Sequence, residues 1–389
     1  MYIAYTAEQQ ALRDELRAYF AALMTPEVEA EVAAGNTGGP HCLEAVRKMG
    51  RDGWLGIGWP KEYGGQGRSL VEQFIFYDEA WRAFAPIPAL TINAVAHTIM
   101  AYGSEDQKRF FLPRILRGEL HFAVGYSEPN AGTDLASLQT RAVRDGDDWV
   151  INGQKLYTSL AAYADYIWLA ARTDPAASKH DGISIFAVPT TAPGFSYSII
   201  HTLVSSGTTA TYYDNVRLPQ SALIGKLNKG WKLITNQLNY ERVAICPPGM
   251  IEQVYEGTVR WAQENTLTDG RRVIDQEWVR INLARVHARL EYLRLINWKV
   301  ASSAALNPAD ASATKVFGTE FFCEAYRLLL EVIGQAGYLR SDSPAAVLRG
   351  RLERAYQGTL FLTFGGGTNE IQRDLIALFG LGMPRVPRM

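Results

Sequence analysis

Over residues 6–119 the apolar positions recur mainly at spacings of three and four, as in 11–20 and 94–102. That period places them on one face of an α-helix, so we expect amphipathic helices from Thr6, a suitable N-cap, to about Glu119. A segment at 58–65 is rich in turn formers and interrupts this pattern. Because Pro60 has no backbone donor, we predict a loop there.

Between residues 121 and 225 the pattern changes to short β-branched or aromatic runs separated by turn signals. The turn signals include DGDD at 145–148 and the pair Asn152-Gly153. The expected strands are FAVGYS, WVI, YIWLAAR, ISIFAV and ATYYDNVRL, and prolines 189, 193 and 219 restrict their surroundings to edges or loops. We predict a barrel or a sandwich.

Helical periodicity returns after Gly230 in long segments at 231–245, 281–305 and 318–333, so a four-helix bundle is expected. No fixed-period repeat or low-complexity tract points to a solenoid. The predicted class is therefore α+β, with an N-terminal helical domain at 1–120, a central β-domain at 121–226 and a C-terminal bundle at 227–389.

The charges nearly cancel, with 39 Lys plus Arg against 40 Asp plus Glu, so no global field favours nucleic acid or an anionic membrane. Three distant cysteines form neither a disulfide framework nor a metal motif, and the N-terminus lacks a basic segment followed by an apolar run. No stretch approaches the ~20 apolar residues of a membrane span. We expect a cytoplasmic protein without membrane insertion, metal, NAD or ATP.

The segment GYSEPNAGTD at 125–134 runs from an expected strand into small and hydroxylated residues. Such a loop leaves backbone N–H groups available to a planar heterocycle or a phosphate, although a polar hairpin connection is the simpler alternative. The order of residues resembles the signature of the acyl-CoA dehydrogenase family, with Tyr126 as a mild departure.

The resemblance extends over nearly the whole chain, through WPKEYGGQG, INGQKLYTS and FGGGTNEIQR. It implies the fold of that family, with an N-terminal helical domain, a β-domain and a C-terminal four-helix bundle, and it implies FAD as cofactor. It assigns cofactor contacts to Tyr126, Ser127, Gly132, Thr133, Tyr157, Ser159, Arg271, Thr368 and Glu370. Without the resemblance, Tyr157 would be interpreted as a packed aromatic of the β-domain.

The catalytic base must be a carboxylate that is partly desolvated, so that its pKa rises toward that of the acidified C–H group. Many family members carry it in a Tyr-Glu-Gly-Thr stretch, but this chain has GGGT at 365–368. Members such as the isovaleryl and long-chain enzymes place it in a Glu-Arg sequence on a bundle helix. The resemblance therefore implies Glu241 as base, with substrate contacts from Thr133, Asn239 and Arg242; the alternative for Glu241 is a solvated helix residue.

The triple glycine also opens space for a wide acyl group, branched or polycyclic. Alternatively it is the tight turn that starts a helix, and both can hold together. By analogy the N–H of Gly366 donates to the thioester carbonyl, together with a ribityl hydroxyl, and stabilises the developing enolate.

Two motifs that reach a neighbouring subunit's FAD in the family are degraded here, to RRVID at 271–275 and EVIGQAG at 331–337. Asp275 would repel a pyrophosphate, and the positive charge of Arg271 would compensate for that repulsion. We therefore expect a different, complementary subunit. Together with YSEPNAGTDLAS, NQLNYERVA and ADASATKVFGTE, this pattern resembles the actinobacterial acyl-CoA dehydrogenases of steroid side-chain breakdown, which are heterotetramers; a homotetramer stays open.

The predicted reaction is α,β-dehydrogenation of a sterol-derived acyl-CoA. In the family the base removes the pro-R α-proton, flavin N5 accepts the β-hydride, and an electron-transfer flavoprotein reoxidises the cofactor. The alternatives are an acyl-CoA oxidase, a non-catalytic structural subunit that completes a partner's FAD site, and a protein that only binds acyl-CoA.

Overall fold

The computed structural model describes residues 4–203, 208–241, 246–303 and 307–385, without the side chains of 237–241. The chain divides into two compact units. The first, here called the bundle unit, comprises Met1–Glu29, Ser69–Ala85 and Arg242–Met389. The second, the sheet unit, comprises Ala30–Arg68 and Pro86–Glu241. The predicted domain boundaries at 120 and 226 are a different division of the chain, and they stay predictions.

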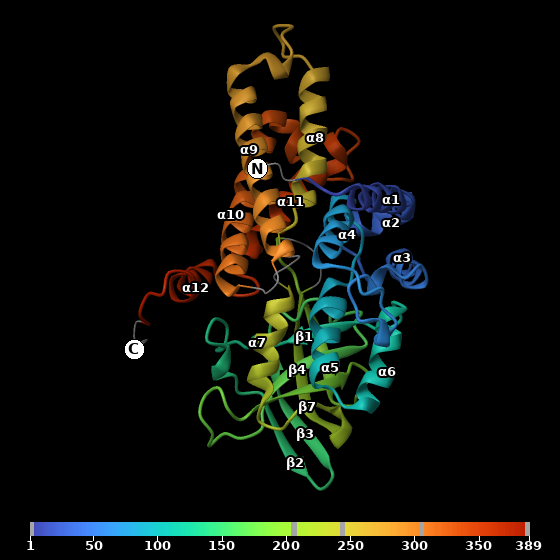
Figure 1. Ribbon diagram of the computed structural model, residues 1–389, viewed down its shortest axis with the longest axis vertical. Helices are drawn as coiled ribbons and strands as arrows, with labels where there is room; N and C mark the ends of the chain where they lie inside the picture. Colours follow the sequence, from blue (N-terminus) through green and yellow to red (C-terminus); the bar gives the residue numbers. More distant parts are fainter. Residues whose placement is uncertain (1–3, 204–207, 242–245, 304–306, 386–389) are drawn as a thin grey trace. The chain divides into compact units, whose positions relative to one another are not determined.

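The bundle unit is built from long helices, with α8–α11 labelled in Figure 1. Its helices are α1 (Ala7–Leu23), α4 (Leu70–Arg82), α8 (Gly249–Glu264), α9 (Glu277–Ser302), α10 (Pro308–Ile333), α11 (Arg351–Thr359) and α12 (Asn369–Leu375), while α2 (Pro26–Ala33) belongs to both units. Helix α10 packs against α8, α9, α11 and α12. Their shared core includes Val286, Leu293, Phe322 and Leu329, all fully buried.

Local capping explains where several helices begin. Thr6 caps α1 through a capping box with Gln9, whose backbone N–H donates to the Thr6 hydroxyl at 3.2 Å while its side-chain oxygen accepts from the Thr6 N–H at 3.0 Å. Ser69 and Ser104 form the same box at α4 and at α6 (Glu105–Leu116). The predicted helical start at Thr6 is therefore confirmed.

The sheet unit contains one eight-stranded mixed sheet. Its strands are β1 (Phe122–Gly125), β2 (Arg141–Asp145), β3 (Asp148–Lys155), β4 (Tyr166–Arg172), β5 (Ile183–Pro189), β6 (Phe195–Ile200), β7 (Thr208–Pro219) and β8 (Leu223–Ile224), in the order β6-β7-β3-β2-β4-β5-β8, with β1 parallel to β4. Helices α3 (Pro40–Arg51), α5 (Ala96–Tyr102), α6 (Glu105–Leu116) and α7 (Gly230–Glu241) and the π-helix Leu90–Val95 belong to the same unit.

Three strands, β2, β6 and the two-residue β8, have no counterpart among the predicted strands. In β2, RAVRD, only Ala142 is buried, and in β6 the four central residues are all exposed. Neither strand therefore carries the apolar alternation by which a half-buried strand is recognised. The DGDD turn between β2 and β3 is confirmed, with Gly146 at φ 62°.

The prediction of a turn at Asn152-Gly153 is wrong, because both residues lie inside β3. They face a β-bulge in β7, where Asn215 has φ 52° and the register shifts by one residue. Asn152 fixes the bulge through its side-chain oxygen, which accepts from the N–H of Asn215 at 3.0 Å. In β7 the bulge shifts the buried positions from odd-numbered residues, Thr211 and Tyr213, to even-numbered ones, Val216 and Leu218, so Tyr213, Val216 and Leu218 share one core.

The predicted loop at 58–65 is confirmed, with one 3₁₀ turn at Lys61–Tyr63. It is anchored by Trp59, which is 2% exposed and whose indole N–H donates to the carbonyl of Ile92 at 3.1 Å. A side chain at Gly65 would lie 2.2 Å from the carbonyl oxygen of Trp59, so only glycine fits there. Among the described helices, none is long and apolar enough to cross a bilayer.

Candidate functional site

The loop after β1 is a closed turn. The N–H of Glu128 donates to the carbonyl of Ala131 at 2.9 Å, and the reverse bond is 3.1 Å long. The interpretation as a hairpin connection is wrong, because β1 and β2 do not pair with each other in the described sheet; both run parallel to β4.

A buried ion pair fastens this loop to β3. The Nζ of Lys155, whose side chain is 0% exposed, donates to Glu128 at 2.7 Å and to the carbonyl of Tyr126 at 3.1 Å. Glu128 also accepts from the N–H groups of Gln139 and Thr140, at 2.7 and 2.9 Å. Burial acts to raise the pKa of Glu128, but Lys155 and the two N–H groups outweigh it, so this pKa is lowered. Burial lowers the pKa of Lys155 to about 8, against the opposing effect of Glu128.

The predicted cofactor residues of this loop are all at least partly exposed. The Tyr126 hydroxyl accepts from the indole N–H of Trp168 at 3.1 Å, and the Ser127 carbonyl accepts from the N–H of Leu156 at 2.8 Å. Gly132 and Thr133 are exposed, and a Cβ added to Gly132 would meet nothing within 4 Å. The backbone here is therefore open to close approach by a ligand.

Tyr157 and Ser159 follow the end of β3. Tyr157 is 64% exposed, so it is not a packed aromatic, and its φ of 57° is unusual for a bulky residue. Ser159 is also exposed, and its hydroxyl donates to Thr208 at 3.3 Å. Strained residues of this kind concentrate at functional sites.

In the bundle unit, the glycine loop at 365–367 leads into α12. Gly366 and Gly367 have φ values of 67° and 97°, and both are exposed. Within the described part of the chain the Gly366 N–H has no hydrogen-bond acceptor. Thr368 caps α12 by accepting from the N–H of Ile371 at 3.3 Å, and Glu370 lies exposed in the first turn of this helix. The loop is thus the tight turn that starts a helix.

The residue beneath this loop was not predicted from the sequence. Lys315 in α10 is 2% exposed, and its Nζ donates to the carbonyls of Thr363 and Gly367, at 3.2 and 2.9 Å, and to the side chain of Asn369 at 2.7 Å. A signal was available, because Lys315 lies in ADASATKVFGTE, a run of small residues that predicts a buried helix face.

For three residues expected to act on the substrate, the structure describes at most the backbone. Glu241 is the last residue of α7 and Asn239 lies two residues earlier, but their side chains are outside the described atoms. Arg242 lies outside the described residues. Their roles stay predictions.

The degraded motif at 271–275 is neutralised within this chain. Arg271 pairs with Asp269 at 2.6 Å, and Arg272 pairs with Asp275 at 2.9 Å. The negative charge of Asp275 was expected to be offset by Arg271. It is instead offset by Arg272, while Arg271 pairs with Asp269.

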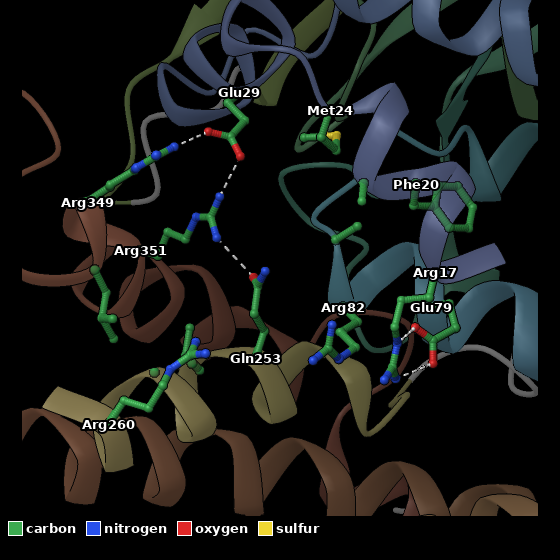
Figure 2. A pocket seen from close by; sticks show the side chains of 15 residues that line it. Arg17, Phe20, Met24, Glu29, Glu79, Arg82, Gln253, Arg260, Arg349 and Arg351 are labelled. Atoms are coloured by element: carbon green, nitrogen blue, oxygen red, sulfur yellow. Dashed lines mark hydrogen bonds and ion pairs between the residues drawn. The ribbon is translucent and has the colours of Figure 1, made fainter. Parts of the chain in front are cut away.

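A separate cavity of about 470 Å³ in the bundle unit contains none of the predicted residues (Figure 2). Its lining includes Arg17, Arg82, Arg260, Arg349 and Arg351. Glu29 pairs with both Arg349 and Arg351, and Glu79 pairs with Arg17. Most of this positive charge is thus neutralised by neighbouring carboxylates, and we assign no catalytic role to the cavity.

No group of three or more His, Cys, Asp or Glu side chains that could hold a metal occurs among the described residues. The chemistry of the two loops is instead that of hydroxyls, an exposed phenol and free backbone N–H groups.

These loops, the mixed sheet and the bundle define an acyl-CoA dehydrogenase, and the chain belongs to that family. The family's N-terminal, middle and C-terminal domain models match residues 6–119, 123–216 and 228–380. The chain is an oxidoreductase of a family that is generally flavin-dependent, and the predicted fold class is confirmed.

The comparisons include close relatives. The acyl-CoA dehydrogenase FadE26 of Mycobacterium tuberculosis is 58% identical over 100% of both chains. A chain of the ChsE4-ChsE5 complex from Mycobacterium tuberculosis is 59% identical, with a TM-score of 0.94 over 99% of this chain and 100% of that one. A chain of the Tcur3481-Tcur3483 steroid acyl-CoA dehydrogenase is 51% identical, also with a TM-score of 0.94 over 99% and 100%.

The residues present fit a flavin dinucleotide. In the sheet unit, Tyr157 is an exposed aromatic ring of the kind on which a planar heterocycle packs, and Gly132 admits close approach. In the bundle unit, the buried Oε1 of Gln372, beside Gly367, has no hydrogen-bond partner among the described residues. A buried acceptor without a partner requires an explanation, and a bound group that donates to it is one such explanation.

Proposed function

We propose that this chain catalyses the FAD-dependent α,β-dehydrogenation of a bulky acyl-CoA thioester, a steroid side-chain CoA, to the trans-2-enoyl-CoA. The observation that carries the proposal is the glycine loop at 365–367, which is exposed at Gly366 and Gly367 and has no side chains where many family members carry a bulky residue and a base. The likeness to a solved steroid acyl-CoA dehydrogenase supports the substrate class.

In this proposal FAD contacts Tyr126, Ser127, Gly132, Thr133, Tyr157, Ser159, Arg271, Thr368 and Glu370. When bound, FAD supplies the acceptor for the hydride that leaves the β-carbon. Glu241 takes the α-proton, the electron pair of that C–H bond forms the new double bond, and the Gly366 N–H stabilises the negative charge on the thioester oxygen. Asn239, Arg242 and Thr133 position the substrate.

The base assignment is tested by Glu241→Gln in the assembled protein. General-base catalysis contributes about 10²- to 10⁴-fold, so we expect kcat to fall by that factor with FAD content unchanged. The control is Glu264→Gln, which changes an exposed glutamate that likewise ends a helix. Unchanged turnover in Glu241→Gln would favour the non-catalytic structural subunit instead.

We further propose a complementary subunit in a heterotetramer. Both solved relatives are described as two-component complexes, and the Arg271 and Arg272 side chains are paired within this chain. On α9, Trp278, Ile281 and Tyr292 are 49%, 43% and 51% exposed, an apolar stripe of the kind that marks a protein interface. Flavin retained by the chain expressed alone, as a homotetramer, would contradict this proposal.

Electron-transfer flavoprotein is the proposed electron acceptor. Rapid reoxidation of the reduced protein by air would favour the acyl-CoA oxidase alternative, whereas slow reoxidation in air and fast transfer to electron-transfer flavoprotein support a dehydrogenase. If the complex bound the thioester but showed no flavin spectrum, the chain would be a protein that only binds acyl-CoA. The cytoplasmic location stays a prediction from the sequence.

A further inference from the structure

The buried cation beneath the glycine loop has no countercharge. The three protons of the Lys315 ammonium group are all donated to neutral oxygens, on Thr363, Gly367 and Asn369. Among the described residues no carboxylate lies within 4.0 Å of its nitrogen. Lys155, the other fully buried lysine, is by contrast paired with Glu128 at 2.7 Å.

Burying an uncompensated charge is strongly unfavourable, and a purely structural role does not require it. Burial lowers the pKa of Lys315, and the opposing effects of Cys246, Glu370 and Glu320 are smaller. A methionine of similar length would fill the same space without the electrostatic cost. A charge buried at this position therefore favours a role in which Lys315 stabilises negative charge that develops nearby.

The contacts of Lys315 also determine the shape of the loop. Two of its acceptors, the carbonyls of Thr363 and Gly367, lie on either side of Gly366, so both ends of the turn are fastened to α10. Asn369, 3% exposed, extends this support by donating to Thr319 and Glu320, both at 3.1 Å. The Gly366 N–H is left without an acceptor between these anchors.

We propose that Lys315 is a positioning residue for the oxyanion donor: it fixes the glycine loop so that the Gly366 N–H is presented to the thioester, and its positive potential stabilises the enolate. This inference rests on the proposed function, because it needs a thioester whose α-proton is removed. Lys315 acts through the loop and does not touch substrate.

The test uses the FAD-loaded complex and a 3-thia analogue of the acyl-CoA, whose α-proton can be removed but which cannot lose a β-hydride. Its α-anion gives a charge-transfer band with the flavin, so the pH midpoint of that band reports α-proton acidity. We expect Lys315→Met to raise the midpoint by at least about one unit and to lower kcat by about 10- to 100-fold, with a small change in KM. The control is Lys299→Met, which removes an exposed lysine of α9 that pairs with Asp310 in α10, and it should match wild type.

A second measurement does not depend on turnover. Hydrogen exchange of the backbone amides of 363–370 should be faster in Lys315→Met than in the wild-type and Lys299→Met proteins. If Lys315→Met does not assemble, Lys315→Arg decides: its guanidinium keeps the charge but cannot reach the same three oxygens, so the midpoint should still rise.

The possible failures are distinguishable. A wild-type protein that neither oxidises acyl-CoA nor forms the α-anion contradicts the proposed function itself. A wild-type protein that does both, with Lys315 variants at the wild-type midpoint, overturns only the role of Lys315. Loss of FAD with an unchanged midpoint in the remaining flavin-loaded protein also overturns it, because Lys315 would then be purely structural.

Discussion

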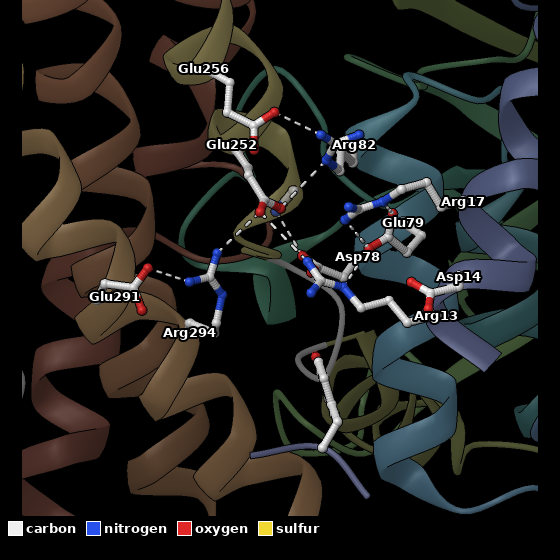
Figure 3. A network of polar contacts seen from close by, with 12 residues as sticks. Arg13, Asp14, Arg17, Asp78, Glu79, Arg82, Glu252, Glu256, Glu291 and Arg294 are labelled. Carbon is white, nitrogen blue, oxygen red and sulfur yellow. Dashed lines mark hydrogen bonds and ion pairs between the residues drawn. The ribbon is translucent and has the colours of Figure 1, made fainter. Parts of the chain in front are cut away.

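The carboxylate of Asp78, within α4, accepts a hydrogen bond of 2.6 Å from the N–H of Gly249, the first residue of α8. It thus caps a helix that is distant in sequence, in a position that leaves Asp78 2% exposed. Around it lies a network of arginines and carboxylates that includes Arg13, Arg294 and Glu252 (Figure 3). Burial raises the pKa of Asp78 to about 7, Glu252 adds to this, and the Gly249 N–H opposes it.

Asp78 should make the protein less stable as the pH rises. Its pKa is about 7 when folded against an ordinary value of 3.8, so between these values the folded state binds more protons, and the stabilisation present at low pH is lost toward pH 7. In Asp78→Asn the amide oxygen still accepts from Gly249 but does not titrate. Denaturant unfolding at pH 5 and pH 8 measures this effect. Because of Asp78, the free energy of unfolding of the wild-type protein should fall by about 2 to 3 kcal/mol between these pH values, and the variant should lack this fall.

The control for this experiment is Asp14→Asn. It removes an exposed carboxylate on α1, which is shown in the same view (Figure 3). It should retain the wild-type pH dependence. Identical pH profiles for the wild-type and Asp78→Asn proteins would mean that Asp78 stays ionised in the folded protein.

Lys155→Met should destabilise the protein by about 3 to 5 kcal/mol, because it leaves the Glu128 carboxylate buried without its partner. The double variant with Glu128→Gln should cost less than the sum of the single changes, since no charge remains buried. Chemical unfolding of the four proteins measures this coupling, and flavin content measures the effect on the loop. Strictly additive free energies would show that the pair is not coupled.

Tyr157→Gly should separate stability from cofactor binding. Glycine adopts a φ of 57° without strain, so the free energy of unfolding should stay equal or rise by up to about 1 kcal/mol, after the entropic cost of glycine. Loss of the exposed ring should weaken FAD binding, whereas Tyr157→Phe should retain it. Equal FAD affinity in all three proteins would remove Tyr157 from the cofactor site.

Gly153→Ala should destabilise the sheet by about 2 to 4 kcal/mol. The new Cβ would lie 2.7 Å from the backbone Cα of Thr140, and the φ of 149° disfavours any side chain. Gly358→Ala, in the helix α11 with open space around it, is the matched control and should stabilise by roughly 0.5 to 1 kcal/mol. Thermal unfolding distinguishes the two, and a tolerated alanine at 153 would contradict the described strand geometry.

The sequence predicted best what depends on neighbouring residues. The cap at Thr6 and the turn at 145–148 are determined within four residues, and both were predicted correctly. Long-range partners were not predicted: Lys155 lies 27 positions from Glu128, and Lys315 lies 54 from Asn369. Lys155 has no local pattern that distinguishes it from a solvated residue, and the small residues around Lys315 indicate a buried helix face but not its hydrogen-bond partners.

The candidate site shows the same limit. The motif residues at 126–134 and 365–368 were found from the order of residues, and the structure describes the turn that each forms. The ion pairs of Arg271 and Arg272 were not expected, because the choice between neighbouring carboxylates depends on backbone geometry. Strand β7 was interpreted as continuous although it contains Asp214-Asn215, a pair that tolerates left-handed backbone.

The bulge at Asn215 has a consequence for how β7 can change in length. The bulge contains one residue that has no partner in β3. The alternation of buried and exposed side chains therefore starts anew on each side of the bulge. A single-residue insertion elsewhere in β7 would invert one half and expose its buried side chains. Length variation among related chains should therefore be confined to 214–215, the one point of the strand where an added or lost residue leaves both faces intact.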